Sequence, residues 1–162
     1  MLEFCGEDRC LVDSNGRVRL PQRLVEDFLK HGNGDVVMYV LPEGAVALYP
    51  ENTYLKMRER ELSDTDAIGS SFSARRSLRR FGSLTRPEKI TRQGRITLPA
   101  RFRELTEITP GCEVCVVGVE IGVEIWAAGR FDAEMQQINL QLEKQRQQEE
   151  EENNINQSSA ER

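Results

Sequence analysis

Hydrophobic and polar residues alternate in two short stretches of this chain that resemble each other. Residues 15–24 read NGRVRLPQRL, and residues 93–102 read QGRITLPARF. Alternation with a period of two predicts a strand in each stretch, because successive side chains of a strand point to opposite faces. The apolar positions are expected to face a core: Val18, Leu20, Ile96 and Leu98. The polar positions are expected to face outward: Arg17, Arg19, Arg95 and Thr97.

The residues around each strand predict how the chain enters and leaves it. Residues 15–16 and 93–94 are Asn-Gly and Gln-Gly, which are typical of tight turns because glycine accepts a positive φ without strain. Pro21 and Pro99 suit the first turn of a short helix. Two further strands are expected after each helix, in the segments VVMYVL and AVALY, and EVCVVGV and VEIW.

The similarity covers a unit of about fifty residues, written twice. Aligning Val12 with Ile90 pairs the glycine turns, the Leu-Pro steps, and Arg23 with Arg101. We expect both of these last arginines to be structural, held by acids on or near their own helices. One unit is too small to bury much apolar surface alone, so the two copies are expected to share one core as an intrachain pseudo-dimer.

A helical linker is expected between the units, over residues 54–83. The segment IGSSFSARRSLRRF places Arg75, Arg76, Arg79 and Arg80 on one arc of a helix, opposite its apolar residues. This basic face could contact DNA phosphates, pair with acids of a neighbouring subunit, or simply face solvent. The pattern does not decide among these alternatives.

Two different segments are expected after the second unit. Phe131, Met135, Ile138 and Leu142 form one apolar stripe on a helix over residues 131–148, which would pack on its own body or on a neighbouring subunit. Residues 149–162 offer almost nothing to bury, so a disordered acidic tail is expected there. Such a tail could screen a basic surface.

Charge is distributed unevenly along the chain. The formal net charge of −5 hides a cationic middle, because residues 72–103 contain ten basic side chains and only Glu88 as an acid. Residues 132–162 are acidic. No apolar run approaches the ~20 residues that span a bilayer, and residues 1–10 lack the pattern of a secretion signal, so a cytoplasmic protein is expected.

Metal and catalytic chemistry have little support in the sequence. Cys5 and Cys10, with Cys112 and Cys115, could in principle offer four thiolates to zinc, but the second pair lies in an expected strand that points them to opposite faces. We expect reduced thiols, no metal and no cofactor. His31 is the single histidine, and no nucleophile, phosphate-loop or dinucleotide motif is present, so neither an enzyme nor a small-molecule ligand is expected.

The repeated phrase Gly-Arg-(Val/Ile)-x-Leu-Pro-x-Arg, with Leu-Tyr-Pro or Ile-Trp closing each unit, resembles the MraZ family. That family is built from two SpoVT-AbrB-like units, and the similarity spans about residues 6–131. The resemblance implies an α+β, mainly β fold of two swapped-hairpin, double-split β-barrel units. The expected segments are 6–53 for the first unit, 54–83 for the linker, 84–130 for the second unit, 131–148 for a C-terminal helix and 149–162 for the tail.

The resemblance also implies a function. The resemblance predicts a nucleoid-associated transcriptional regulator, a repressor of its own cell-division and cell-wall operon. Such a protein would bind repeated boxes in double-stranded DNA as a ring-like homo-oligomer. An RNA-binding or protein-partner module, or an oligomeric scaffold with weakened DNA binding, remains an alternative on the same fold.

Candidate DNA contacts follow from the family phrase Asp-x-Lys-Gly-Arg, in which the lysine and arginine beside the turn serve DNA. Arg17 and Arg95 match the arginine, whereas Asn15 and Gln93 stand at the lysine position. An outward arginine beside a glycine turn would project from a hairpin tip, where its guanidinium can pair with guanine or with phosphate.

The positions next to this phrase differ between the copies. Asp13 matches the family's aspartate in the first copy, and Thr91 replaces it in the second, where Arg92 adds a charge one residue later. Arg19 and Arg92 complete the predicted DNA-binding set.

Overall fold

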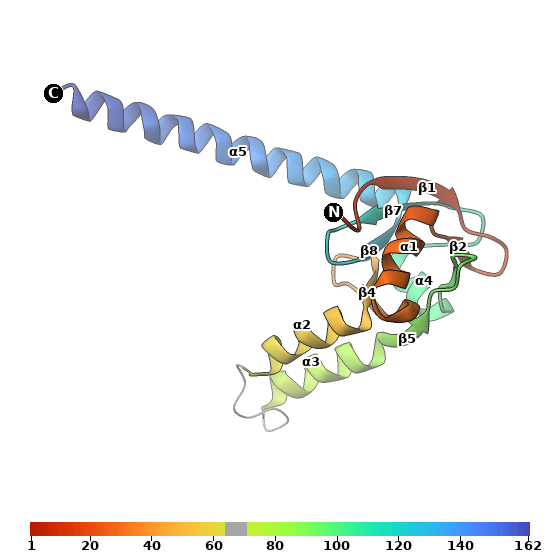
Figure 1. Ribbon diagram of the computed structural model, residues 1–162. Helices are drawn as coiled ribbons and strands as arrows, with labels where there is room; N and C mark the ends of the chain where they lie inside the picture. Colours follow the sequence, from red (N-terminus) through yellow and green to blue (C-terminus); the bar gives the residue numbers. More distant parts are fainter. Residues whose placement is uncertain (64–70) are drawn as a thin grey trace. The chain divides into compact units, whose positions relative to one another are not determined.

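The computed structural model describes residues 1–63 and 71–162, and it divides into one unit over Met1–Ala128 and a second over Gly129–Arg162 (Figure 1). The strands of the first unit are β1 (Glu7–Leu11), β2 (Arg17–Arg19), β3 (Asp35–Val40), β4 (Val46–Pro50), β5 (Thr85–Lys89), β6 (Arg95–Thr97), β7 (Glu113–Gly118) and β8 (Val123–Ala127). Its helices are α1 (Gln22–Lys30), α2 (Glu51–Ser63), α3 (Phe72–Ser83) and α4 (Ala100–Thr106), with a short 3-10 turn at Gly32–Gly34. Helix α5 (Ala128–Ala160) forms the second unit. The fold is therefore α+β, as expected.

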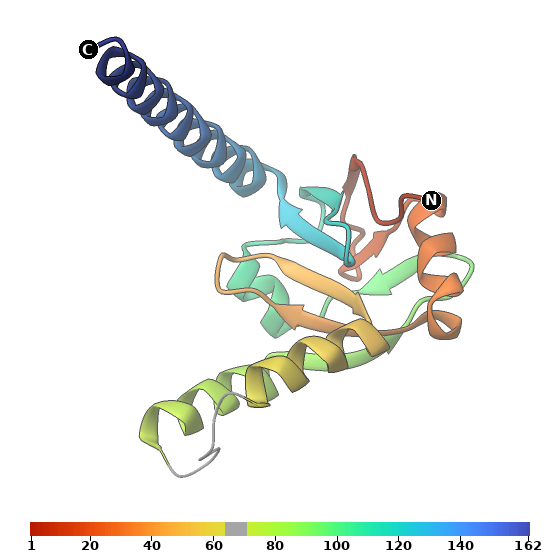
Figure 2. The same cartoon turned by 60° about the vertical axis from the view of Figure 1, so that its left-hand side comes forward.

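The two repeats exchange strands within one antiparallel sheet of order β1-β7-β8-β4-β3-β5. Strand β1 of the first repeat pairs with β7 of the second, and β5 of the second repeat pairs with β3 of the first. The two central strands, β4 and β8, join the halves to each other. Three of the neighbouring pairs in the sheet of Figure 2, β1–β7, β8–β4 and β3–β5, therefore come from segments that lie far apart in the sequence.

A separate two-stranded ribbon is formed by β2 and β6, one strand from each repeat. The expected hairpin tip is therefore incorrect, because β2 pairs with β6, and β1 belongs to the other sheet. Strands β1 and β5 were not expected either. They are the edge strands of the sheet, and their charged sequences, with Pro87 in β5, lack the apolar alternation that predicts a strand.

One apolar core is shared by both repeats. The inward positions of the ribbon, Val18 and Ile96, are 0% and 3% exposed, as the alternation predicts. They pack in one cluster with alternate residues of the large sheet, with Leu24 and Phe28 of α1, and with Phe102 of α4. Both short helices begin directly after a proline, Pro21 and Pro99, which supplies the N-cap residue with an extended ψ.

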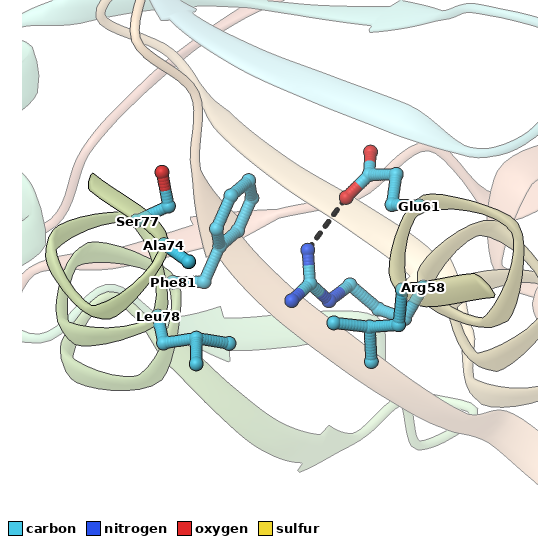
Figure 3. A pocket seen from close by; sticks show the side chains of 7 residues that line it. Arg58, Glu61, Ala74, Ser77, Leu78 and Phe81 are labelled. Atoms are coloured by element: carbon cyan, nitrogen blue, oxygen red, sulfur yellow. Dashed lines mark hydrogen bonds and ion pairs between the residues drawn. The ribbon is translucent and has the colours of Figure 1, made fainter. Parts of the chain in front are cut away.

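Helices α2 and α3 lie side by side and cover the other face of β3 and β4 (Figure 1). Tyr39 stacks on Phe81 with ring centroids 5.3 Å apart. Figure 3 shows the Arg58 guanidinium facing the Phe81 ring and bonded to Glu61, and it lies 4.2 Å from the ring centroid. The aromatic and cation–π contacts thus fix the helical linker on the sheet. Linker residues 64–70 lie outside the described parts of the chain.

The acidic tail differs from expectation, because α5 continues as one helix to Ala160. Arg146 bonds to Glu143 three residues before it and to Glu150 four residues after it, and such pairs support a solvent-exposed helix. The residues beyond 149 are exposed, as expected for a segment with little to bury. The stripe residues Met135, Ile138 and Leu142 are 38%, 37% and 56% exposed.

Candidate nucleic-acid interface

The β2–β6 ribbon gathers the predicted arginines on one face. Arg17 pairs with Thr97, and Arg19 pairs with Arg95, across the antiparallel register. Directly opposed residues share a face of an antiparallel ribbon, and so do residues two apart on one strand. Since Val18 and Ile96 point to the core, these four polar side chains lie on the outer face.

The ribbon is nearly symmetric about its centre, because Val18 pairs with its own repeat equivalent, Ile96. Reciprocal hydrogen bonds lock its two ends: the Leu20 N–H donates to the Gly94 carbonyl at 2.8 Å, and the Leu98 N–H donates to the Gly16 carbonyl at 2.9 Å. Each repeat therefore clamps the glycine turn of the other. The outward arginines are held on a rigid, doubly anchored element.

In the first turn, Asp13 holds Arg17 through backbone and side chain. Asp13 Oδ1 accepts the Asn15 and Arg17 N–H groups, both at 2.9 Å, and Oδ2 accepts Arg17 Nε at 2.8 Å. The hydrogen bond from the Arg17 N–H, more than any other contact, lowers the pKa of Asp13 below its ordinary value. Arg17 is thus positioned and its charge is balanced.

The second turn has the same backbone but no such carboxylate. The Gly94 N–H donates to the Thr91 carbonyl at 2.9 Å, as the Gly16 N–H donates to the Asp13 carbonyl at 3.1 Å. Among residues 1–63 and 71–162, the structure records no ion pair or side-chain hydrogen bond for Arg95. The two matched arginines therefore differ in their local charge.

The turn residues at the family's lysine position, Asn15 and Gln93, are exposed, and so is Arg92. A groove of about 520 Å³ brings Arg92 and Gln93 beside Arg19 of the other repeat, with Cys10 and Gln22 also in its wall. A smaller hollow of about 170 Å³ on the ribbon is lined by Asp13, Arg17, Arg19 and Arg95, together with Leu11 and Val18. Arg19 lines both, so it connects the groove to the ribbon face.

The equivalent helix arginines of the two repeats, Arg23 and Arg101, either hold the fold together or face solvent. Arg23 donates to the Cys5 carbonyl and pairs with Asp8, so it ties α1 to β1. Arg101 lies 4.0 Å from Glu104 in an exposed pair of little energetic value. The nearby acid Asp27 instead accepts the Phe4 N–H at 3.0 Å.

The basic face of α3 is divided by its contacts. Arg80 donates to the Val40 carbonyl at 3.0 Å and to the Tyr39 hydroxyl at 3.4 Å, so it is occupied by the sheet. Arg76 and Arg79 remain exposed. Arg76 lies over the Phe72 ring, 5.4 Å from its centroid.

The cysteines do not converge on one site. Cys115 is buried, and Cys10 and Cys112 pack against the main core. Burial raises the pKa of the Cys10 thiol. Among the residues that the structure describes, no group of three potential ligands could hold a metal ion, and no helix is long and apolar enough to cross a membrane.

Two contributors to the interface were not assigned from the sequence: Asp13 as the residue that holds Arg17, and Thr97 as its cross-strand partner. The role of Asp13 could have been predicted from the sequence, because an aspartate at the start of a turn often accepts a hydrogen bond from the backbone N–H two residues later. The role of Thr97 could not, because it depends on the pairing of strands from different repeats.

These features define a class of protein: two interlocked α+β repeats that present a rigid, arginine-bearing ribbon. The family described as "MraZ protein, putative antitoxin-like" matches residues 88–155. A protein named Transcriptional regulator MraZ from Moorella thermoacetica is 32% identical over 86% of this chain and 92% of its own length. Proteins of the same name from Natranaerobius thermophilus (32% identical over 83% and 87%) and Symbiobacterium thermophilum (35% over 78% and 85%) are similar too. The chain belongs to the MraZ family.

Proposed function

We propose that this protein is a transcriptional regulator that binds double-stranded DNA through the outer face of the β2–β6 ribbon. The observation that carries the proposal is the placement of Arg17, Arg19 and Arg95 on one face of a rigid two-stranded element. The major groove admits a two-stranded β-ribbon, and arginine is the side chain that most often pairs with guanine there. The name of its relatives, Transcriptional regulator, supports the same function.

The finer parts of the proposal concern the operator and the assembly. We infer that the protein acts in the cytoplasm at the nucleoid, represses its own division and cell-wall operon, and binds repeated boxes as a ring-like oligomer. The strand exchange between repeats fits the swapped-hairpin barrel of such regulators. The exposed stripe on α5 supports self-association, because unburied apolar side chains at helical spacing favour packing against another surface.

The test is a binding titration with the DNA upstream of the protein's own operon, repeated over a salt series. Specific binding with a steep salt dependence is expected, and the double variant Arg17→Ala/Arg95→Ala should weaken it at least tenfold. Lys56→Ala, on the exposed face of α2, is the matched control and should bind as the unchanged protein does.

An oligomeric scaffold is the second candidate. Asn15 and Gln93 at the lysine position, and the pairing of Arg17 with Asp13, favour it because they reduce the free positive charge at the turns. Failure of the intact protein to bind the upstream DNA at low salt would overturn the regulator proposal and leave the scaffold.

A further inference from the structure

The ribbon is symmetric in its backbone but not in its charge. One end carries Arg19 opposite Arg95, followed by the turn with Arg92. The other end carries Arg17 opposite Thr97, followed by the turn with Asp13. The first end therefore has three cations, and the second has one cation paired with one anion.

The separation of the two ends is large enough for this difference to matter. Outward positions on one strand are two residues apart, or about 7 Å, and the turns lie farther out. Physiological salt screens charges over about 8 Å. The negative charge of Asp13 therefore balances that of Arg17 well, but it balances the arginines at the other end of the ribbon only partly. Among the described residues, the side chains of Arg19, Arg92 and Arg95 have no recorded ion pair or hydrogen bond.

The two ends also differ in how firmly their arginines are held. Asp13 is fixed by two backbone N–H groups and in turn holds Arg17 Nε at 2.8 Å. Within residues 1–63 and 71–162, the terminal nitrogens of this guanidinium have no recorded partner and can donate to a ligand. A preorganised fork is suited to a base edge, which accepts hydrogen bonds in a fixed direction. Unrestrained arginines beside a groove are suited to phosphates, whose oxygens accept from many directions.

We infer that the two ends of the ribbon have different roles on DNA. Arg19, Arg92 and Arg95 neutralise backbone phosphates, whereas Asp13 positions Arg17 for hydrogen bonding to a base edge. The groove of about 520 Å³ that is lined by Arg19 and Arg92 is the place for the phosphate backbone. Its wall also contains Arg9 and Asp8, and the charge of Asp8 is balanced by Arg23. This inference rests on the proposed DNA-binding function and specifies the roles within it.

Two reciprocal substitutions test the inference in the full chain. Asp13→Asn keeps an oxygen that can accept the turn N–H groups but removes the balancing charge. It should therefore tighten binding to a random-sequence duplex several-fold and steepen the log–log salt slope by about one. Thr91→Asp places a carboxylate at the equivalent position before Arg95, and it should weaken the same binding and flatten the slope by about one.

A third variant separates affinity from discrimination. Asp13→Asn/Arg17→Gln removes both charges of the pair, so the salt slope should stay unchanged while the preference for operator over random duplex falls about 5- to 150-fold. Arg19→Ala, Arg92→Ala or Arg95→Ala should instead weaken both duplexes alike. Thermal unfolding of each variant shows whether it is folded. If Asp13→Asn does not fold, Thr91→Asp still tests the inference, because residue 91 is exposed.

The outcomes distinguish the inference from the proposed function. If the unchanged protein binds no duplex at low salt, the DNA-binding function itself is wrong. If it binds with a clear salt slope, but Asp13→Asn and Thr91→Asp leave that slope unchanged or shift it in the same direction, only the assignment of different roles to the two ends is wrong.

Discussion

Gly16 and Gly94 occupy equivalent turns, yet a side chain at each would meet different neighbours. Both have a positive φ, +74° and +71°. A Cβ at Gly16 would lie 2.8 Å from Nε of Arg103, whereas one at Gly94 would lie 2.8 Å from the Val25 methyl and 3.2 Å from the Leu20 carbonyl oxygen. The Arg103 side chain can move aside, although this would break its hydrogen bond to the Leu98 carbonyl, whereas a buried valine and a backbone oxygen cannot move without disturbing the packing around them.

We therefore expect Gly16→Ala to lower the free energy of unfolding by about 1–2 kcal/mol, the cost of the left-handed backbone alone. Gly94→Ala should cost about 1 kcal/mol more, because it also overpacks the core. Urea denaturation followed by circular dichroism measures the difference. Gly82→Ala is the control: a Cβ there meets nothing within 4 Å, so stability should hold or rise. Equal losses at Gly16 and Gly94 would contradict the packing argument.

The outward direction of the site arginines could be predicted from sequence, but their neighbours could not. Alternation within a single strand correctly placed Arg17, Arg19 and Arg95 opposite the core side. The juxtaposition of Arg19 with Arg95 depends on pairing between repeats that lie far apart in the chain. No local pattern specifies that register, so only the structure reveals which charges share an end.

At the scale of elements, α3 shows that a helical charge pattern does not reveal which charges are free. Arg79 and Arg80 are adjacent on the predicted basic arc, but Arg80 bonds to the Val40 carbonyl and Arg79 is exposed. Arg80→Ala should therefore lower the free energy of unfolding by about 1.5–3 kcal/mol, the usual range for hydrogen bonds to a charged donor. Arg79→Ala should change it by less than about 0.5 kcal/mol. Chemical denaturation of both variants measures these losses. Similar free energies of unfolding for the two variants would show that the hydrogen bonds of Arg80 do not contribute to stability.

Helix α5 was predicted only as far as residue 148, because the composition of residues 149–162 is typical of disorder. The structure instead shows how local ion pairs continue the helix: Arg146 bridges Glu143 and Glu150. The hydrogen bond from Arg146 is the main cause that lowers the pKa of Glu143 below its ordinary value of 4.5. A lowered pKa means that the stabilisation is complete above pH 4.5 and is lost as the pH falls through the lowered value.

Arg146→Ala should therefore slightly reduce the helicity of residues 143–155 at neutral pH, because exposed pairs at this spacing support a helix only weakly. The difference from the unchanged protein should shrink as the pH falls below 4.5 and through the lowered pKa of Glu143, where this carboxylate loses its charge. NMR Cα chemical shifts of this segment report the helicity. Lys144→Ala, which removes a neighbouring cation without a recorded partner in the described chain, should leave them nearly unchanged. A difference that persists unaltered in acid would contradict the role of the ion pair.

At the scale of the whole molecule, the shared core was predictable from the repeated phrase. The exchange of strands was implied only by the family resemblance, because no local pattern of this chain predicts it. The edge strands β1 and β5 have weak patterns of their own, and each is completed by the hairpin of the other repeat. The core likewise mixes residues of both halves, including Val18 with Ile96 and Leu24 with Phe102. Neither repeat can therefore close its sheet or cover its core by itself.

Separate chains of residues 1–83 and 84–162 should consequently have no folded monomeric state. Each would lack the partner of its edge strand and half of the shared core, and a chain of that size buries little surface alone. Dispersed NMR spectra are expected only on mixing the two halves, or at concentrations at which one half pairs with a second copy of itself. The unfolding midpoint should then rise with protein concentration, as mass action requires for a folded state that needs two chains. A half-chain that gives a dispersed spectrum and sediments as a monomer at low micromolar concentration would show that the strand exchange is not needed for folding.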